Sequence, residues 1–100
     1  MAKPFQYRFE WDPVKARQNI RKHRIAFDRA ATIFLDPAAL SEFDEKHNDR
    51  EDRWVTLGLD TVGVLLVVCH TFEEIPDGAR VRIISARKAT MRESKQYRRA

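Results

Sequence analysis

The fold of this chain depends on the stretch VRIISARKATMRESKQY, residues 81–97, which carries signals for a strand, a short link and a helix. At its start the apolar residues Val81 and Ile83 alternate with the cation Arg82. This alternation is typical of a strand with one buried face and one polar face. We therefore expect a strand over residues 80–85.

A helix is expected at the end of the same stretch. Thr90 stands three residues before Glu93. At that spacing the threonine hydroxyl accepts from the amide of the third helical residue, and the glutamate reaches back to the threonine amide. This capping box predicts a helix from about Met91 to Arg99.

Cations are concentrated between this strand and this helix. Arg82 lies near the end of the expected strand, with Arg87 and Lys88 in the link, so we expect the three to gather and to be able to bind phosphate. The alternative is a basic strand edge that prevents aggregation, together with a helix end that favours cations. Residues 80–100 contain eight Lys and Arg against the single anion Glu93, which is more than the alternative needs.

Length and charge narrow the class of protein. The 100 residues are enough for one domain, residues 1–100, that folds without metals or disulfides. A formal charge of +4 and a pI of about 9.6 favour polyanionic partners, nucleic acid above all. The single cysteine, Cys69, is interpreted as a small buried residue in a reducing compartment. The longest apolar run, residues 62–69, is far below the ~20 residues that a membrane span needs, so we expect a cytoplasmic protein with no membrane contact.

The remaining elements follow from caps, turns and apolar periods. They are a short strand near residues 7–10, a helix from Pro13 to about His23 or Arg24, a second helix that Asp28 caps and that stops at Asp36 and Pro37, a possible strand at 38–43, and strands at 54–59 and 64–72. Residues 73–79 are expected to form a hairpin loop. The result is an α+β fold, a small antiparallel sheet of three to four strands packed with two N-terminal helices and one C-terminal helix.

His70 is the histidine of most interest. It ends the central expected strand, after apolar residues on its own side, and we therefore place it at the rim of the sheet close to Arg82. A histidine there titrates near neutrality and can exchange protons. It can equally be a rim residue with satisfied hydrogen bonds. Asn19 and His23, four residues apart on the first helix, are interpreted as hydrogen-bonding to backbone at the helix end.

No metal or cofactor is expected from the sequence. The three histidines are far apart, and Cys69 and His70 would point to opposite faces of a strand. There is no glycine-rich phosphate loop, because the chain has only three glycines, each at a turn or strand position.

Most of the chain resembles one known family. The segments that carry the resemblance are FEWDPVKARQNIRKH (9–23), AFDRAATIFLDP (26–37), DRWVTLGLD (52–60), LLVVCHT (65–71) and RIISARKATMRESKQY (82–97). In order and spacing they are similar to the BrnT toxin family of type II toxin-antitoxin systems. The family pattern often has glycine where this chain has Arg24, and arginine adopts a positive φ less readily than glycine if the end of the first helix requires one.

The resemblance implies a compact ribonuclease, related in fold to RelE-type toxins, that a BrnA-like ribbon-helix-helix antitoxin inhibits. The toxin-antitoxin pair would bind its own operator DNA. The family's recurring polar positions fall here on Trp11, Asp12, Lys15, Asn19, Lys22, His23, Arg53, Trp54, His70, Arg82, Ser85, Arg87 and Glu93.

The leading hypothesis is a metal-independent endoribonuclease in which the ribose 2′-hydroxyl attacks the adjacent phosphate of mRNA. Such chemistry needs a base, cations around the phosphate and an acid. We assign His70 as acid or base, and Arg82 and Arg87 as the pair that binds the phosphate. Substrate-binding candidates are Lys22, His23, Arg53, Trp54 and Lys88. Trp54 can stack on a base, although such a tryptophan is more often part of the core.

A binding module without catalysis is the rival hypothesis. In that case the basic surface holds nucleic acid or an acidic antitoxin segment, and His70 is structural. An independent DNA-binding regulator is disfavoured, because no helix-turn-helix pattern is present.

Overall fold

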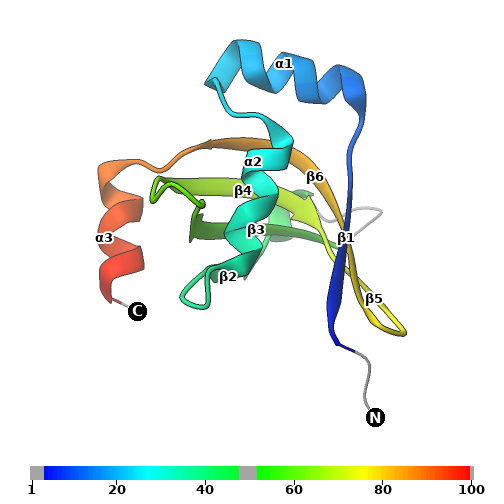
Figure 1. The fold of residues 1–100 in the computed structure, drawn as a ribbon. Helices are drawn as coiled ribbons and strands as arrows, with labels where there is room; N and C mark the ends of the chain where they lie inside the picture. Colours follow the sequence, from blue (N-terminus) through cyan, green and yellow to red (C-terminus); the bar gives the residue numbers. More distant parts are fainter. Residues whose placement is uncertain (1–3, 48–51, 100) are drawn as a thin grey trace.

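The computed structural model describes residues 4–47 and 52–99 of the protein, which form a six-stranded mixed sheet with helices on both sides (Figure 1). The elements in chain order are β1 Gln6–Glu10, α1 Pro13–His23, α2 Phe27–Ala31, the 3-10 helix η1 Thr32–Leu35, β2 Leu40–Phe43, the 3-10 helix η2 Glu45–His47, β3 Arg53–Leu59, β4 Leu65–Thr71, β5 Glu73–Ile75, β6 Gly78–Lys88 and α3 Met91–Arg99. The α+β class predicted from the sequence is confirmed.

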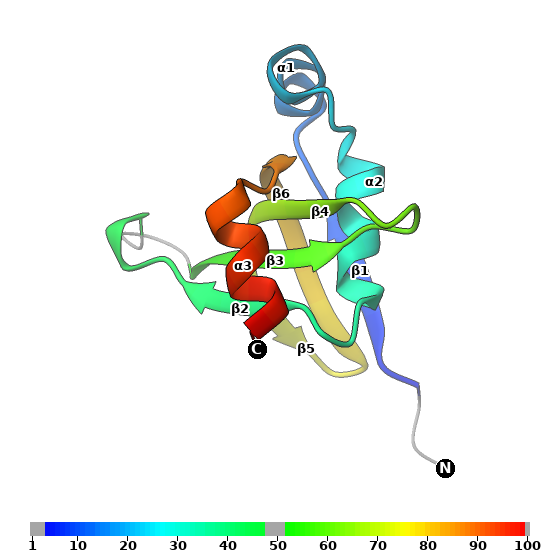
Figure 2. The same ribbon diagram turned by 90° about the vertical axis from the view of Figure 1, so that its left-hand side faces the viewer.

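Strand β6 is the strand on which the sheet is built. The strand order is β1-β6-β4-β3-β2, and β5 also pairs with β6. β1 runs parallel to β6, whereas the other pairs are antiparallel. Two distant parts of the chain, the N-terminal strand and the strand before the last helix, therefore lie side by side (Figures 1 and 2).

The strand count and the purely antiparallel pairing predicted from the sequence are both wrong, because β1 joins the sheet in parallel. The sheet has six strands instead of three to four, residues 73–79 contain β5 instead of forming only a loop, and the strand expected over 80–85 runs from Gly78 to Lys88. The pairing of β1 with the start of β6 depends on Gly78. A Cβ atom there would collide with the backbone of Gln6, so only glycine lets β1 approach.

A β-bulge in β6 changes which side chains share a face. Cys69 pairs with Ser85, but the next residue, His70, pairs with Ile83, so Ile84 is the extra residue. Without the bulge, strict alternation from Arg82 would turn the side chains of Ser85 and Arg87 toward the core. With it, both share the face of Arg82.

One face of the sheet carries the hydrophobic core. Fully buried side chains of the α2 region, Ile25, Phe27, Ala30 and Ile33, pack on Leu66, Val68, Val81, Ile83 and Ala86 of β4 and β6. Burying one large apolar side chain contributes about 1.5–3 kcal/mol. This face is therefore closed to ligands, and any site on the sheet must use the other face.

Helix α1 begins and ends as the sequence predicts. The Asp12 carboxylate accepts from the Val14 amide at 2.8 Å, and Pro13 takes the first helical position. The helix ends at Arg24, whose φ of 62° is left-handed, so an arginine occupies a conformation that glycine adopts with less strain. The Asn19 side chain donates to the carbonyls of Ile25 and Ala86 at 2.8 Å and accepts from the Ala86 amide at 3.1 Å. The prediction for Asn19 is thus confirmed by the bond to Ile25, whereas the bonds to Ala86 of β6 were not predicted, and His23 makes no such bond within the described residues.

Helices α2 and α3 show one error and one success of the sequence-based prediction. α2 begins at Phe27 with Ala26 as its cap, two residues before the cap expected at Asp28. In α3 the capping box is present: the Thr90 amide donates to Glu93 Oε1 at 2.8 Å, and the Glu93 amide donates to Thr90 Oγ1 at 3.2 Å. Figure 2 shows that α2 and α3 lie on different sides of the sheet.

Candidate functional site

The face of the sheet opposite the core, which we call the open face, carries the candidate site. Side chains on it come from β2, β3, β4 and β6, and they are Leu40, Glu42, Arg53, Val55, Leu57, Val67, Cys69, Thr71, Arg82, Ser85 and Arg87. Cys69, expected to be buried, is only partly buried there. The open face is apolar at one end, and its three arginines lie toward β6 and the start of β3.

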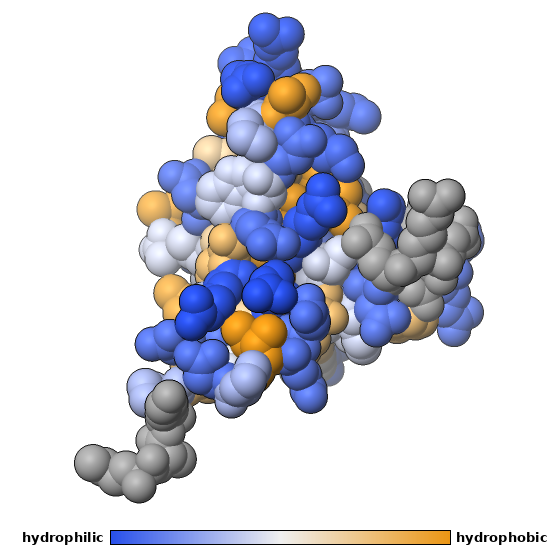
Figure 3. Space-filling view, turned by 90° about the vertical axis from the view of Figure 1, so that its right-hand side faces the viewer, coloured by the Kyte–Doolittle hydropathy of each residue, from blue (hydrophilic) through white to orange (hydrophobic). Residues whose placement is uncertain are grey.

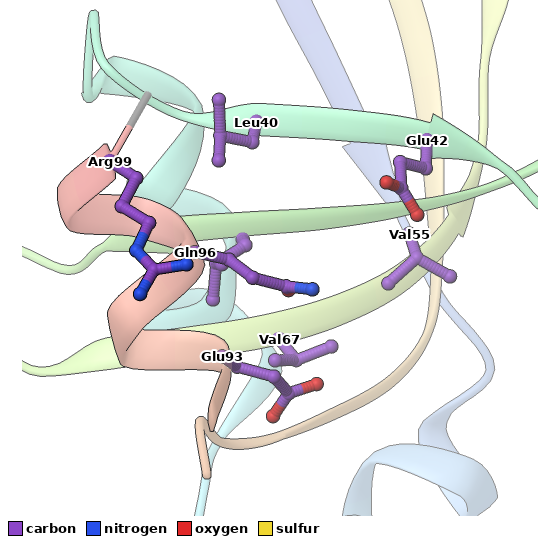
Figure 4. Close-up of a pocket in the computed structure, with 8 residues that line it drawn as sticks. Leu40, Glu42, Val55, Val67, Glu93, Gln96 and Arg99 are labelled. Atoms are coloured by element: carbon purple, nitrogen blue, oxygen red, sulfur yellow. The ribbon is translucent and has the colours of Figure 1, made fainter. Parts of the chain in front are cut away.

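Helix α3 covers only the apolar end of the open face. Between helix and sheet is a groove of about 400 Å³ with an apolar floor and charged or polar walls (Figure 4). It is lined by Leu40, Glu42, Val55, Leu57 and Val67 of the sheet and by Glu93, Gln96 and Arg99 of α3. No helix of the described residues lies over the rest of the open face.

The side of the molecule that carries β1 and β5 has a different kind of surface. On the side that carries β1 and β5, hydrophilic residues dominate and hydrophobic ones appear only in small separate areas (Figure 3).

Two arginines flank a threonine hydroxyl on the open face. Thr71 of β4 pairs with Arg53 of β3, and its Oγ1 accepts from the Arg82 amide of β6 at 3.2 Å. Neighbouring strands are about 4.8 Å apart. The backbones of the two arginines therefore lie roughly that distance from Thr71, on opposite sides of it. Arg82 is exposed and Arg53 is partly buried. Guanidinium groups on both sides of a hydroxyl can bind a phosphate and orient it.

Arg87 lies at the other end of the open face and is held by Glu93. Its Nη1 and Nη2 donate to the two carboxylate oxygens of Glu93 at 2.8 and 2.9 Å, and Nη1 also donates to the Lys88 carbonyl at 3.3 Å. The hydrogen bond from Arg87 outweighs the effect of burial and lowers the pKa of Glu93 to about 2, while Glu93 raises the pKa of Arg87. The pair is therefore ionised at any physiological pH.

The three cations predicted to gather do not gather. Arg82, Arg87 and Lys88 all lie within β6, and none is in a link. Arg82 and Arg87 are five positions apart on β6, and one of the residues between them is the extra residue of the bulge. They are therefore roughly 13 Å apart along the strand. Lys88 pairs with Leu66 and so lies on the opposite face from Arg87. The geometry favours two phosphate positions on the open face over one shared phosphate.

His70 is buried, so its predicted place at the rim is wrong. The residue is 2% exposed and its ring contacts Phe34 edge to face at 4.8 Å. Its Nδ1 lies 2.9 Å from the Thr71 carbonyl oxygen, which can only accept, so Nδ1 carries the proton. In the neutral ring Nε2 then accepts from Thr56 Oγ1 at 2.6 Å, and Thr56 accepts from Ser41 Oγ at 2.7 Å.

The environment of His70 keeps it neutral. Burial lowers the pKa of the imidazole, and only the hydrogen bond to Thr71 acts in the other direction. The sequence could not show this burial, because the ring is covered by Phe34 of η1, which lies far away in the chain. The role in proton transfer stays a prediction, and the geometry argues against it.

The candidates from α1 lie at the C-terminal end of β6. Asn19 binds Ala86, so the last turn of α1, with exposed Lys22 and partly buried His23, lies beside that strand end (Figure 1). Lys88 is exposed at the same end. These three residues are thus separated from Arg53 and Arg82 by much of the length of β6.

Trp54 packs on another aromatic ring. It pairs with His70 in register and meets Phe43 edge to face at 5.2 Å. Trp54 is partly buried and Phe43 is 40% exposed. The two rings form an aromatic surface beside β2, which is consistent with stacking and with a structural role.

One contact of the candidate site and one contact that only fixes α3 were not predicted from the sequence. The only sequence signal for Thr71 was its position next to His70 in the expected strand, which turns the two side chains to opposite faces. The Tyr97 hydroxyl donates to Asp36 Oδ2 at 2.7 Å and fixes the far end of α3. Burial of Asp36 is outweighed by hydrogen bonds from the Leu59 amide, Tyr97 and the Ala38 amide, so its pKa is lowered. No sequence pattern connects residues so distant in the chain.

Two absences concern residues 4–47 and 52–99. Within them, no three His, Cys, Asp or Glu side chains lie close enough to hold a metal ion. No helix among them is long and apolar enough to cross a membrane.

The chain is similar to a known protein family and to a solved structure. Residues 11–93 match the family model described as the ribonuclease toxin BrnT of type II toxin-antitoxin systems. The crystal structure of the Brucella abortus ribonuclease toxin BrnT is similar, with a TM-score of 0.55 and 22% identity over 91% of this chain and 100% of that chain. At this identity the similarity concerns the fold. Comparison with curated proteins gives no match.

Proposed function

Because the chain belongs to the BrnT family of ribonuclease toxins of type II toxin-antitoxin systems, we propose that it is an endoribonuclease that cleaves mRNA without a metal ion and thereby arrests growth. The observation that carries this proposal is the set of three arginines, Arg53, Arg82 and Arg87, on the one face of the sheet that the core leaves uncovered. We further expect it to act in the cytoplasm, where mRNA is found.

The proposed reaction is attack of a ribose 2′-hydroxyl on the adjacent phosphate. Negative charge grows on the phosphate in the transition state, and preorganised cations stabilise it. Arg82 and Arg53, on either side of Thr71, are suited to bind the reacting phosphate. Arg87 is suited to bind a second phosphate of the same RNA.

The proton-transfer group is the least defined part of the proposal. His70 is the candidate from the sequence, but its ring is enclosed on the core side and both nitrogens are hydrogen-bonded. We therefore assign His70 a supporting role, in which it fixes the backbone of Thr71. His23, Lys22 and Lys88 lie at the other end of β6 from Arg53 and Arg82, so we propose that they bind the RNA chain beyond the reacting phosphate and do not transfer its protons.

A binding module without catalysis remains the second candidate. Burial of His70 and neutralisation of Arg87 by Glu93 favour it, because both remove groups that catalysis could use. Its ligand would be RNA or an acidic antitoxin segment.

Membership of the family implies an antitoxin partner. We propose that this partner is a BrnA-like ribbon-helix-helix protein, and that the complex binds operator DNA. The antitoxin would cover the basic surface formed by α1 and α3, which lie beside the same end of β6 (Figure 1). It would then block RNA directly.

Cleavage of a labelled mRNA by purified, antitoxin-free protein in EDTA tests the proposal. Wild-type protein is expected to cut, and Arg82→Ala is expected to cut about 10²-fold more slowly. RNA that stays intact at high protein concentration, yet is retained on the protein, would establish the binding module instead. Cleavage that EDTA abolishes and Mg²⁺ restores would overturn metal independence.

A further inference from the structure

Glu93 makes two different sets of contacts from the first turn of α3. Its carboxylate receives the Thr90 amide, which completes the helix cap, and it receives both terminal nitrogens of Arg87. The cap alone would explain a glutamate at this position. The bidentate contact with Arg87 is additional, and it joins the helix to the open face of β6.

The contact with Glu93 uses only part of the Arg87 guanidinium. A guanidinium has five N–H donors in a rigid planar fork. Glu93 takes one from Nη1 and one from Nη2, and the Lys88 carbonyl takes a second from Nη1. Among the described residues no acceptor takes the Nε–H or the remaining Nη2–H, which lie on one edge of the fork. Arg87 therefore keeps one complete edge for a bidentate ligand.

We propose that Glu93 is a positioning residue, which holds Arg87 so that this unused edge of the guanidinium faces an RNA phosphate on the open face. The inference rests on the proposed ribonuclease function, which it deepens by assigning a role to a residue outside the arginine set. A free arginine has many rotamers, whereas one held at two points meets the phosphate already oriented.

The positioning role and a merely structural role of Glu93 differ in what they predict for kinetics. Loss of the carboxylate removes the orientation of Arg87 but also releases its positive charge. Attraction of RNA is then kept or increased, while orientation in the transition state is lost. The expected signature is a lower kcat with a KM that does not rise.

Glu93→Gln is the test variant, because glutamine keeps the size of the side chain and can still serve in a capping box. Its amide cannot accept at both positions, so the bidentate contact is lost. Tyr97→Phe is the matched control. It removes the other hydrogen bond that fixes α3, from Tyr97 to Asp36, and leaves Arg87 and Glu93 untouched.

Cleavage of a labelled RNA in EDTA is measured for both variants, far below the melting temperature of the less stable one. Glu93→Gln is expected to lower kcat by about tenfold to a hundredfold, the size of effect that misplacement of the bound substrate produces. Tyr97→Phe is expected to leave kcat within about twofold of wild type. Equal losses in the two variants would make Glu93 structural and overturn the proposal.

The double variant Arg87→Ala/Glu93→Gln gives a second, independent readout. If Glu93 acts through Arg87, Glu93→Gln adds no further loss of kcat/KM once Arg87 is alanine. Additive losses would overturn the positioning role while leaving the ribonuclease function in place. Wild-type protein that leaves RNA intact would instead overturn the proposed function and this inference together.

Discussion

Arg82 and Arg87 extend from the same face of β6, although they are five positions apart, because the bulge at Ile84 shifts the alternation of the strand by one position. Arg82 lies at the end of the open face that includes Thr71 and Arg53. Arg87 lies at the end that α3 covers. The bulge thereby converts one strand into a support for two cationic positions. Bulges are common where a strand must redirect side chains next to a functional site.

Arg82→Ala is expected to abolish growth arrest and to lower RNA cleavage by about 10²-fold, because it removes a cation from the growing charge on phosphate. Arg82 is exposed, so the free energy of unfolding should stay within about 0.5 kcal/mol of wild type. Arg8→Ala, at an exposed cation of β1 that pairs with Asp77, is the control and should still arrest growth. A large fall in the melting temperature of Arg82→Ala would show that its role is structural.

The pair Arg87 and Glu93 should make stability depend on acid. The pKa of Glu93 is about 2 in the folded protein against an ordinary value of 4.5. The folded state therefore binds fewer protons in that window, and the contribution of the pair is complete above pH 4.5 and lost as the pH falls toward 2. Because Arg87 is partly exposed, the contribution is about 1 kcal/mol. Denaturant titrations of wild type and Glu93→Gln should differ by this amount at pH 7 and converge near pH 2; a constant difference would contradict the assignment.

His70 should lower stability as the pH falls below its ordinary pKa of 6.5. Burial lowers the pKa of the folded ring, so the unfolded chain takes up a proton first and unfolding becomes easier. His70→Gln, which cannot reproduce both ring hydrogen bonds, should lose about 1–3 kcal/mol of stability and this pH dependence. The folded fraction should still cleave RNA. His70→Gln with an unchanged melting temperature and cleavage a hundredfold slower would restore His70 as the proton-transfer group.

Arg24→Gly should stabilise the protein. Arg24 has a φ of 62°, which costs a non-glycine residue on the order of 1–2 kcal/mol. Glycine removes that strain but makes the unfolded chain more flexible, so the expected net gain is about 0.5–1 kcal/mol. Arg24→Ala is the control: it removes the same charge and keeps the strain, so its melting temperature should not rise. A rise in both variants would assign the effect to charge.

RNA and antitoxin should compete for the toxin, if both use the surface that α1 and α3 form at the end of β6. Complementary charge also speeds association, and its effect falls with ionic strength. Complex formation should therefore weaken as salt rises, and added antitoxin should displace labelled RNA. A ternary complex that forms without loss of affinity for either partner would show two separate surfaces.

Local sequence patterns by themselves determined the caps of α1 and α3, the apolar strands and the family. Asp12 with Pro13 and Thr90 with Glu93 make hydrogen bonds within a few residues of the chain, so their spacing alone predicts α1 and α3. The apolar residues of β3 and β4 likewise predict strands without reference to any partner. The functional class followed from motifs that span residues 11–93.

Tertiary structure alone decided which face each side chain occupies. The burial of His70 comes from Phe34 and Thr56, the pairing of β1 from the close approach at Gly78, and the position of Arg87 from a register shift against β4. Each of these depends on contacts between segments far apart in the chain. A shift of one residue in register exchanges the two faces of a strand, so the site could be predicted as a set of residue types but not as a geometry.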